Sequence, residues 1–281
     1  MPELPDVEIF RQYLESTSLH KNIIDTEVRE PFLVEGAPVQ EFCQSLKLKR
    51  MTDTARHGKY LLVNLDGQLW IVMHFGMTGS LCYYRHGDPE PGHAKIRFTF
   101  DTGYHLAYTS RRKLGKVFLI TSPQDFIRVR QLGHDALSQR MDFSLFRRVL
   151  SRKRGMIKPA LMDQSIIAGI GNIYSDEILF QAGVNPARQL DSLREDQLLK
   201  IFTAMKKVLN IAIRFEADPS LFPDACLLPR RVSGGLCPRC RSELKFRKIS
   251  GRTAFFCPQC QPEPVRASSE KDPREGTIRA C

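Results

Sequence analysis

The chain has 281 residues, and its 42 lysines and arginines outnumber 31 acidic residues, which gives a formal net charge of +11 and a sequence pI of about 9.4. That length is too great for one small core and indicates about two or three folding units. The charge favours a polyanionic partner, and no apolar run approaches the ~18 residues that span a bilayer, so we expect nucleic acid rather than a membrane. A basic protein whose charge only keeps it soluble is the competing explanation.

The first part of the chain predicts one helix followed by many short strands. Apolar residues recur at helical spacing over residues 5–17, and β-rich runs then follow between residues 22 and 122. Asp66 and Gly67 predict a two-residue hairpin turn between KYLLVNL and QLWIVMHF, and residues 101–103 are expected to join IRFTF to YHLAYT. Short strands separated by turn signals are typical of a β-sandwich or barrel.

Helical periodicity returns after residue 142. It covers FSLFRRVLSRK, a segment around Met162, NIYSDEILFQAG and residues 192–215, and it predicts a separate helical domain. A loop rich in proline and glycine follows over residues 216–235, and the polar C-terminal end predicts a disordered tail. The expected organisation is α+β multidomain, with units at residues 1–135, 136–230 and 231–262 and the tail at 263–281.

Four of the eight cysteines form two tight pairs. Cys237-x2-Cys240 is followed after sixteen residues by Cys257-x2-Cys260, which matches the spacing of four-cysteine zinc sites. Each pair forms a knuckle that presents two thiolates, so the pattern predicts one closed, structural Zn²⁺ site in a zinc ribbon. A redox dithiol is the alternative. Free thiols beside a thiolate metal site are typical of a reducing, intracellular compartment.

The segment between the cysteine pairs is expected to form a hairpin. It carries Arg247, Lys248 and Arg252 beside two phenylalanines. Basic side chains on a rigid hairpin are well placed to hold phosphates, and a solvated loop without a binding role is the alternative.

Six motifs link these elements to a known family. In chain order they are PELPDVE, HGKYLL, HFGMTG, IKPALMDQ, AGIGNIYSDEILF and GRTAFFCPQCQ. Together they resemble the formamidopyrimidine-DNA glycosylase and endonuclease VIII family over residues 2–262. The resemblance implies an N-terminal β-sandwich with an N-terminal helix, a helix–two-turn–helix domain and a C-terminal zinc-ribbon finger. It also implies a monomeric, cytoplasmic enzyme, nucleoid-associated if bacterial, that acts on double-stranded DNA containing damaged bases.

The implied chemistry begins at Pro2, whose amine becomes free when Met1 is removed. An α-amine with a pKa near 8 is about one tenth unprotonated at neutral pH, whereas a lysine is unprotonated only to a few parts in ten thousand. A secondary amine that attacks the sugar forms a cationic iminium, which serves as an electron sink for base loss and strand elimination. Without the other motifs, Pro2 would be an ordinary residue near a helix start.

The resemblance assigns three further residues to catalysis. Glu3 corresponds to the general acid/base that handles the protons of the sugar ring and base. Lys59 corresponds to the lysine of phosphate contact and β-elimination, and Arg252 to the finger arginine that grips the phosphates beside the lesion and is linked to δ-elimination. The implied reaction is therefore base excision followed by β,δ-elimination.

DNA contacts are implied at further positions. Because an enzyme that acts on a duplex base must flip it out, Met77 is expected to fill the gap and Arg112 to face the orphaned base. The GIGN turn is expected to present exposed backbone N–H groups to a phosphate, together with the Asn172 side chain. The remaining positions that align with DNA contacts are His93, Leu114, Lys153 and Lys158.

Three departures from the family pattern leave the preferred lesion open. Leu114 stands where oxidised-purine enzymes commonly have phenylalanine, Asp6 replaces the usual glutamate, and residues 216–235 are shorter than the usual glycine-rich loop. Formamidopyrimidines and oxidised purines are the expected substrates, and oxidised pyrimidines are the alternative. Two alternatives belong to other functional classes. One is a catalytically idle zinc protein that binds damaged DNA, and the other is a zinc-ribbon RNA-binding protein.

Overall fold

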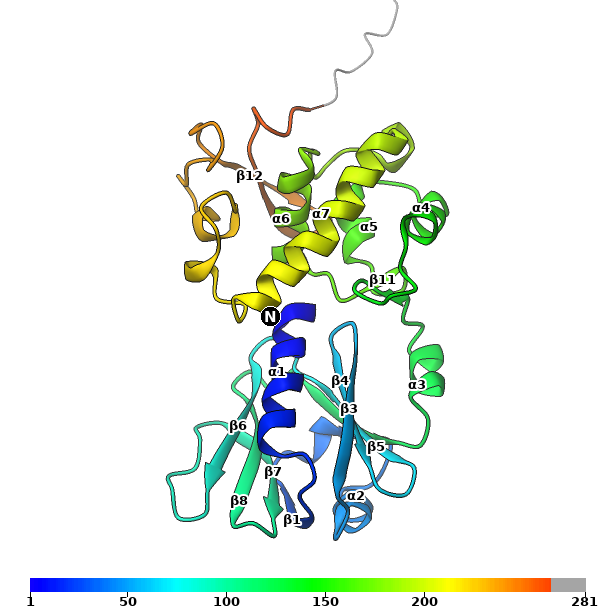
Figure 1. Cartoon of the computed structure of the whole chain (residues 1–281), viewed down its shortest axis with the longest axis vertical. Coiled ribbons are helices and arrows are strands. Elements are labelled where there is room, and N and C mark those ends of the chain that lie inside the picture. Colours follow the sequence, from blue (N-terminus) through cyan, green and yellow to red (C-terminus); the bar gives the residue numbers. More distant parts are fainter. Residues whose placement is uncertain (264–281) are drawn as a thin grey trace, which may run out of the picture.

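Two β-sheets pack face to face in the N-terminal half of the chain, in a computed structural model that describes residues 1–263 (Figure 1). One sheet has the order β1 (Ile23–Val28), β7 (Ala94–Phe100), β8 (Tyr104–Ser110), β6 (Gly79–Arg85). The other has the order β2 (Val34–Glu35), β9 (Lys116–Ile120), β5 (Leu69–His74), β4 (Tyr60–Leu65), β3 (Met51–His57). Alternate residues of β7 are buried, so one face of its sheet forms core. The predicted β-sandwich is confirmed.

The β4–β5 hairpin differs from its prediction. Leu65 pairs with Leu69, so the loop contains three residues, Asp66 to Gln68, and not two. Gly67 and Gln68 have φ values of +87° and +70°. Asp66 is held back toward β3 because its backbone N–H donates to Arg50 O and its carboxylate accepts from Arg50 N. Gln68 therefore becomes the last turn residue, as in three-residue hairpins. The β7–β8 hairpin has the predicted loop over residues 101–103.

Helix α1 (Leu4–Thr17) connects the two halves of the molecule. Its first turn is capped because the Asp6 carboxylate accepts a hydrogen bond from Glu3 N at 2.9 Å. Val7 and Leu14 pack into the sandwich core, whereas Leu4 packs into the core of the helical half. The N-terminal end of α1 consequently lies beside the end of α7 (Figure 1).

The second half of the described chain is mainly helical. Its principal helices are α4 (Phe143–Ser151), α5 (Ile157–Met162), α6 (Asn172–Ala182) and α7 (Glu195–Arg214). The smaller elements along the chain are α2 (Val39–Leu46), α3 (Pro123–Val129), η1 (Pro31–Leu33), η2 (Leu190–Ser192), η3 (Pro219–Leu221), η4 (Leu228–Arg230), β10 (His134–Asp135) and β11 (Ile167–Ala168). The helices enclose buried residues such as Ile178 and Met205, which confirms the predicted helical part. None of the helices in the described residues could cross a membrane.

The C-terminal hairpin consists of β12 (Lys245–Ile249) and β13 (Arg252–Phe256). Both residues of its turn, Ser250 and Gly251, have positive φ, which suits the twist of a two-residue hairpin. The hairpin base packs on Phe180 of α6. The tail predicted from residue 263 onward lies, apart from that residue, outside the described residues.

Candidate active site

The Glu3 carboxylate lies at the N-terminal end of helix α6. It accepts hydrogen bonds from the backbone N–H groups of Gly171 (2.7 Å), Ile173 (2.8 Å) and Tyr174 (3.3 Å). The positive end of the helix dipole and these unpaired N–H groups favour an anion at this point. The side chain is only 1% exposed, so its position is fixed by protein contacts rather than by water.

Two glycines allow this close approach. A Cβ atom at Gly171 would lie 2.3 Å from the Glu3 carboxyl carbon, and one at Gly169 would lie 2.5 Å from Leu4 Cδ1. The Gly169 carbonyl also accepts from Leu4 N at 3.0 Å. Two N–H groups of the GIGN turn are therefore not open to a phosphate as predicted, because Gly171 N donates to Glu3 and Gly169 N donates to Gln164 Oε1 at 3.0 Å.

The environment of Glu3 suits proton transfer. Burial raises the pKa of the carboxyl above its ordinary value, and the Lys59 charge and the three N–H groups lower it in opposition. The net direction is upward. A carboxyl whose pKa is shifted toward neutrality can both hold and release a proton under physiological conditions.

Lys59 lies at the tip of the β3–β4 hairpin. The turn residue Gly58 has φ +57°, and its N–H donates to the Asp135 carboxylate at 2.7 Å. A Cβ at Gly58 would lie 2.7 Å from Ala168 Cβ, so the hairpin tip packs against the helical half. Burial lowers the pKa of the Lys59 ammonium; Glu3 opposes this shift and Arg252 adds to it.

Four predicted catalytic residues thus come from three parts of the chain. Pro2 and Glu3 precede α1, Lys59 caps a sandwich hairpin, and Arg252 begins β13. We call these four residues the catalytic cluster. The charges of Glu3 and Arg252 both act on the pKa of Lys59, in opposite directions. Pro2 is half-buried and Met1 is exposed. The Pro2 nitrogen forms an amide bond with Met1 as long as Met1 is present.

Predicted DNA contacts gather on two neighbouring loops. Met77 and Leu114 are 40% and 51% exposed, so both apolar side chains are accessible to a partner. The loops touch because a Cβ at Gly76 would lie 2.5 Å from Leu114 C, and Arg112 N donates to Thr78 Oγ1 at 3.0 Å. His93 is the exposed residue directly before β7. Its φ is +65°, and its carbonyl accepts a hydrogen bond from Ser110 N.

Lys158 differs from its prediction. Its side chain is buried, and its ammonium donates to Asp176 Oδ1 (2.7 Å), Ser175 Oγ (2.7 Å) and the Asn172 carbonyl (3.0 Å). Because all three donors have protein partners, the predicted direct contact of Lys158 with DNA is wrong. Lys153, in contrast, is exposed and pairs with Asp163 at 3.2 Å.

Two acidic residues of α6 were not predicted from the sequence. Asp176 and Glu177 are buried although they lie in the middle of a helix. The only signal was their position inside the otherwise apolar run NIYSDEILF, since buried carboxylates require partners. Asn172 was predicted as a site residue, and its side-chain oxygen is buried without a hydrogen-bond partner among residues 1–263.

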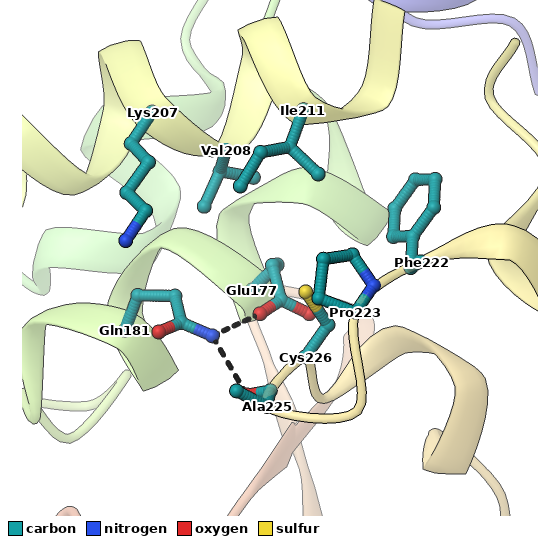
Figure 2. A pocket seen from close by; sticks show the side chains of 9 residues that line it. All are labelled: Glu177, Gln181, Lys207, Val208, Ile211, Phe222, Pro223, Ala225 and Cys226. Atoms are coloured by element: carbon teal, nitrogen blue, oxygen red, sulfur yellow. Dashed lines mark hydrogen bonds between the residues drawn. The ribbon is translucent and has the colours of Figure 1, made fainter. Parts of the chain in front are cut away.

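A small cavity lies beneath the 219–226 segment, away from the catalytic cluster. Figure 2 shows Glu177 and Gln181 of α6 facing Lys207, Val208 and Ile211 of α7, with Phe222 and Cys226 closing one side. Gln181 donates to Glu177 (2.7 Å) and to the Ala225 carbonyl (3.0 Å). The cavity measures about 120 Å³. No residue of the catalytic cluster lines it, so it is not part of the candidate active site.

The four paired cysteines converge at the base of the hairpin. The sulfur atoms of Cys237, Cys240, Cys257 and Cys260 all lie within 4.8 Å of one another. Backbone N–H groups point at two of them: Arg239 N donates to Cys237 Sγ (3.4 Å) and Cys260 N to Cys257 Sγ (3.3 Å). Four soft donors supported by N–H groups fit a tetrahedral metal ion, so this cluster is a metal-binding site.

His74, the last residue of β5, should make the stability of the fold depend on pH. Burial, reinforced by Lys59 and Arg130, lowers the pKa of His74 from 6.5 to about 4. The folded state therefore resists protonation that the unfolded state accepts below pH 6.5. We expect native stability to be complete above pH 6.5 and to fall by up to about 3 kcal/mol as the pH drops toward 4.

Chemical unfolding of the native protein, His74→Gln and the exposed-site control His20→Asn across pH 4 to 7 measures this contribution. His74→Gln should lose less stability on acidification than the native protein, whereas His20→Asn should follow it. Parallel curves for all three proteins would contradict the assignment to His74.

Comparisons with known proteins come from both sequence and structure. The family model described as formamidopyrimidine-DNA glycosylase N-terminal domain matches residues 1–117, and the corresponding H2TH domain model matches residues 132–223. The chain is similar to the formamidopyrimidine-DNA glycosylase of Heliobacterium modesticaldum, at 34% identity over 278 residues that cover 93% of this chain and 100% of that protein. The Pelotomaculum thermopropionicum protein of the same name is 31% identical, with 93% and 99% covered.

Solved structures agree with these matches. The Lactococcus lactis formamidopyrimidine-DNA glycosylase bound to AP-site DNA has a TM-score of 0.84 at 27% identity, with 93% of this chain and 100% of that chain covered. Its inhibited form with N7-benzyl-Fapy-dG DNA has a TM-score of 0.86 at 28% identity and the same coverage. A MutM complex with carbocyclic 8-oxo-G DNA has a TM-score of 0.84 at 27% identity, also with the same coverage.

Proposed function

The chain belongs to the formamidopyrimidine-DNA glycosylase family and is a base-excision repair DNA glycosylase with AP lyase activity, and on this premise we propose how its own residues perform the reaction. The substrate is double-stranded DNA containing oxidised bases of the formamidopyrimidine or oxidised purine type. The single observation that carries the mechanism is the Glu3 carboxylate, held on the α6 N-terminus directly after Pro2 and within the charge field of Lys59.

The reaction starts at the nitrogen of Pro2 after Met1 has been removed. The amine lone pair attacks C1′ of the flipped nucleotide, the bond from C1′ to the base breaks, and the base leaves with that electron pair and a proton. Opening of the sugar ring then gives an iminium between the Pro2 nitrogen and C1′, while the ring oxygen takes up a proton.

Glu3 transfers these protons. Its raised pKa allows the carboxyl to carry a proton to the ring oxygen, and its three backbone donors stabilise the carboxylate that remains. The side chain has little freedom to leave this position because the glycine contacts surround it. Glu3 therefore acts as the general acid/base beside the nucleophile.

Lys59 and Arg252 serve the elimination steps. The iminium withdraws electrons, so loss of a proton from C2′ expels the 3′ phosphate, and a second elimination expels the 5′ phosphate. Two cations at the site stabilise the leaving phosphates. Burial that lowers the pKa of Lys59 also raises the fraction of its free amine, which can accept the proton lost from C2′ in β-elimination.

Further exposed residues are proposed to contact the DNA around the flipped nucleotide. Exposed Met77 and Leu114 are apolar enough to replace a flipped base in the stack, and the neighbouring Arg112 can bond to the base left behind. His93, Lys153 and the Asn172 side chain are the proposed phosphate contacts. The preference for formamidopyrimidines and oxidised purines is supported by the DNA named for the structural relatives, which contains Fapy-dG or 8-oxo-G.

Borohydride trapping on duplexes with defined lesions tests the proposed function. Reduction converts the iminium into a stable amine, so the native protein should become covalently joined to DNA that contains a formamidopyrimidine or 8-oxoguanine and not to intact duplex. Absence of an adduct with every oxidised-base duplex would refute the mechanism. Trapping that occurs only with oxidised pyrimidines would overturn the proposed lesion preference.

Metal removal gives a second test. We propose that the four paired cysteines hold one structural Zn²⁺, whose binding energy stabilises the fold of the finger. Without it Arg252 loses its position, and the loss of one charged phosphate contact corresponds to about 1.5–3 kcal/mol, roughly a tenfold to hundredfold weaker DNA affinity.

Metal analysis together with DNA-binding titrations before chelation, after chelation and after zinc is restored measures this effect. The restored protein is the control for irreversible damage. Native affinity after verified metal loss would argue against a phosphate-gripping finger.

A further inference from the structure

Asp176 is the centre of a buried polar cluster that the catalytic mechanism does not use. Both of its carboxylate oxygens have partners: Oδ1 accepts from Lys158 Nζ at 2.7 Å, and Oδ2 accepts from Arg231 Nε (2.8 Å) and Phe255 N (3.1 Å). Asp176 and Lys158 are both fully buried. An ionised group at such a site is retained only with this degree of hydrogen bonding.

The three partners belong to different parts of the chain. Lys158 comes from α5, Arg231 from the segment before the first zinc-ribbon cysteine, and Phe255 from strand β13. Arg231 reinforces the link to that strand, because its guanidinium also donates to the Thr253 carbonyl at 3.4 Å and lies 4.8 Å from the Phe255 ring centre. One carboxylate therefore ties the finger to the helical half.

Helix α6, which carries Asp176, also binds the general acid Glu3 at its N-terminal end. Glu3 bonds to Ile173 N and Tyr174 N in the first turn of α6, and Asp176 follows within the next turn. Arg252 lies three residues before Phe255 on β13, whose main chain is fixed by Asp176. Helix α6 thus serves as a rigid spacer between Glu3 and the strand that carries Arg252.

We propose that Asp176, acting with Arg231, is a positioning residue that sets the place of Arg252 relative to Glu3. The inference rests on the proposed function, because it assigns Arg252 to the second elimination. Asp176 does not touch the substrate; it acts through the strand. Its loss should therefore weaken the step that depends on the finger arginine more than the steps carried out by Pro2 and Glu3.

Arg231→Gln is the first test, because this side chain is only partly buried (17% exposed) and its removal leaves the buried Lys158–Asp176 pair intact. With abasic-site duplex, the ratio of δ- to β-elimination product should fall about tenfold, while borohydride adduct formation stays within about twofold of native. Zinc content should be unchanged. Arg231→Lys should restore part of the ratio, since an ammonium can still pair with Asp176.

Arg194→Gln is the matched control, because Arg194 forms an equivalent arginine–aspartate pair on the exposed surface with Asp196. It should leave the product ratio unchanged. Asp176→Asn is the deeper variant and should lower the ratio further, because Lys158 and Arg231 then face an amide without charge. If Asp176→Asn fails to fold, the ratio measured for Arg231→Gln decides the proposal.

A native product ratio in Arg231→Gln would overturn the positioning role. An equal fall in both eliminations would also overturn it, since that is the result of a general loss of structure. Failure of the native protein to form any adduct would refute the proposed function instead, so the two failures are distinguishable.

Discussion

Protein that keeps Met1 will form no borohydride-trapped adduct with damaged or abasic DNA. The nitrogen of Pro2 is then an amide whose lone pair is delocalised into the carbonyl, so it cannot attack C1′. Base excision should fall by at least about three orders of magnitude, the scale expected when the nucleophile of a covalent mechanism is lost. The α-amine of Met1 belongs to an exposed residue and lies one residue further from Glu3, so we expect that it does not replace the Pro2 nitrogen.

The experiment needs two forms of one preparation. Protein made in cells without methionine aminopeptidase activity is assayed before and after treatment with that enzyme, and mass spectrometry gives the N-terminal residue of each sample. Adduct yield should follow the fraction that starts at Pro2. Full activity of the form that starts at Met1 would overturn the mechanism.

Replacement of Glu3 by glutamine will reduce base excision by about a hundredfold to ten-thousandfold, the range expected for loss of a general acid/base. A glutamine amide cannot deliver the proton that opens the sugar ring. Its NH2 group would also face one of the N–H donors of α6, where the carboxylate now accepts. The effect should be smaller on abasic DNA, whose ring-opened aldehyde can react with Pro2 without that proton transfer.

Single-turnover rates on lesion and abasic duplexes separate these two effects. Glu41→Gln, at an exposed position of α2, is the matched control and should behave as native. Thermal unfolding of Glu3→Gln shows whether the changed hydrogen bonds at α6 also alter stability. Equal rate losses on both substrates would indicate damage to the fold rather than loss of proton transfer.

Much of the fold was predictable from local pattern. Helical periodicity located α1, α4, α6 and α7, and the cysteine spacing predicted the cluster that the sulfur atoms form. The order of the six motifs identified the family. These features depend on residues that are close in sequence, or on motifs that can be recognised without knowing what they contact.

Predictions failed where the answer depended on distant partners. The glycines of GIGN suggested a phosphate loop, yet Gly171 makes room for Glu3, 168 positions earlier in the chain, and Gly169 makes room for Leu4. Lys158 was expected to contact DNA because it aligns with a DNA-contacting position of the family, whereas in the structure it pairs with Asp176 in the interior. The third residue of the β4–β5 loop depends on the hydrogen bonds between Asp66 and Arg50, the residue just before β3.

The hydrogen bonds of Glu3 to α6 can form only late in synthesis of the chain. The N-terminus leaves the ribosome first, but the donors that fix Glu3 are residues 171–174. At about 5–20 residues per second, roughly ten to thirty seconds pass before they are made. During that interval the Glu3 carboxylate lacks its partners on α6, so we expect the first residues to remain open to an aminopeptidase. Maturation of the nucleophile can thus precede assembly of the site around it.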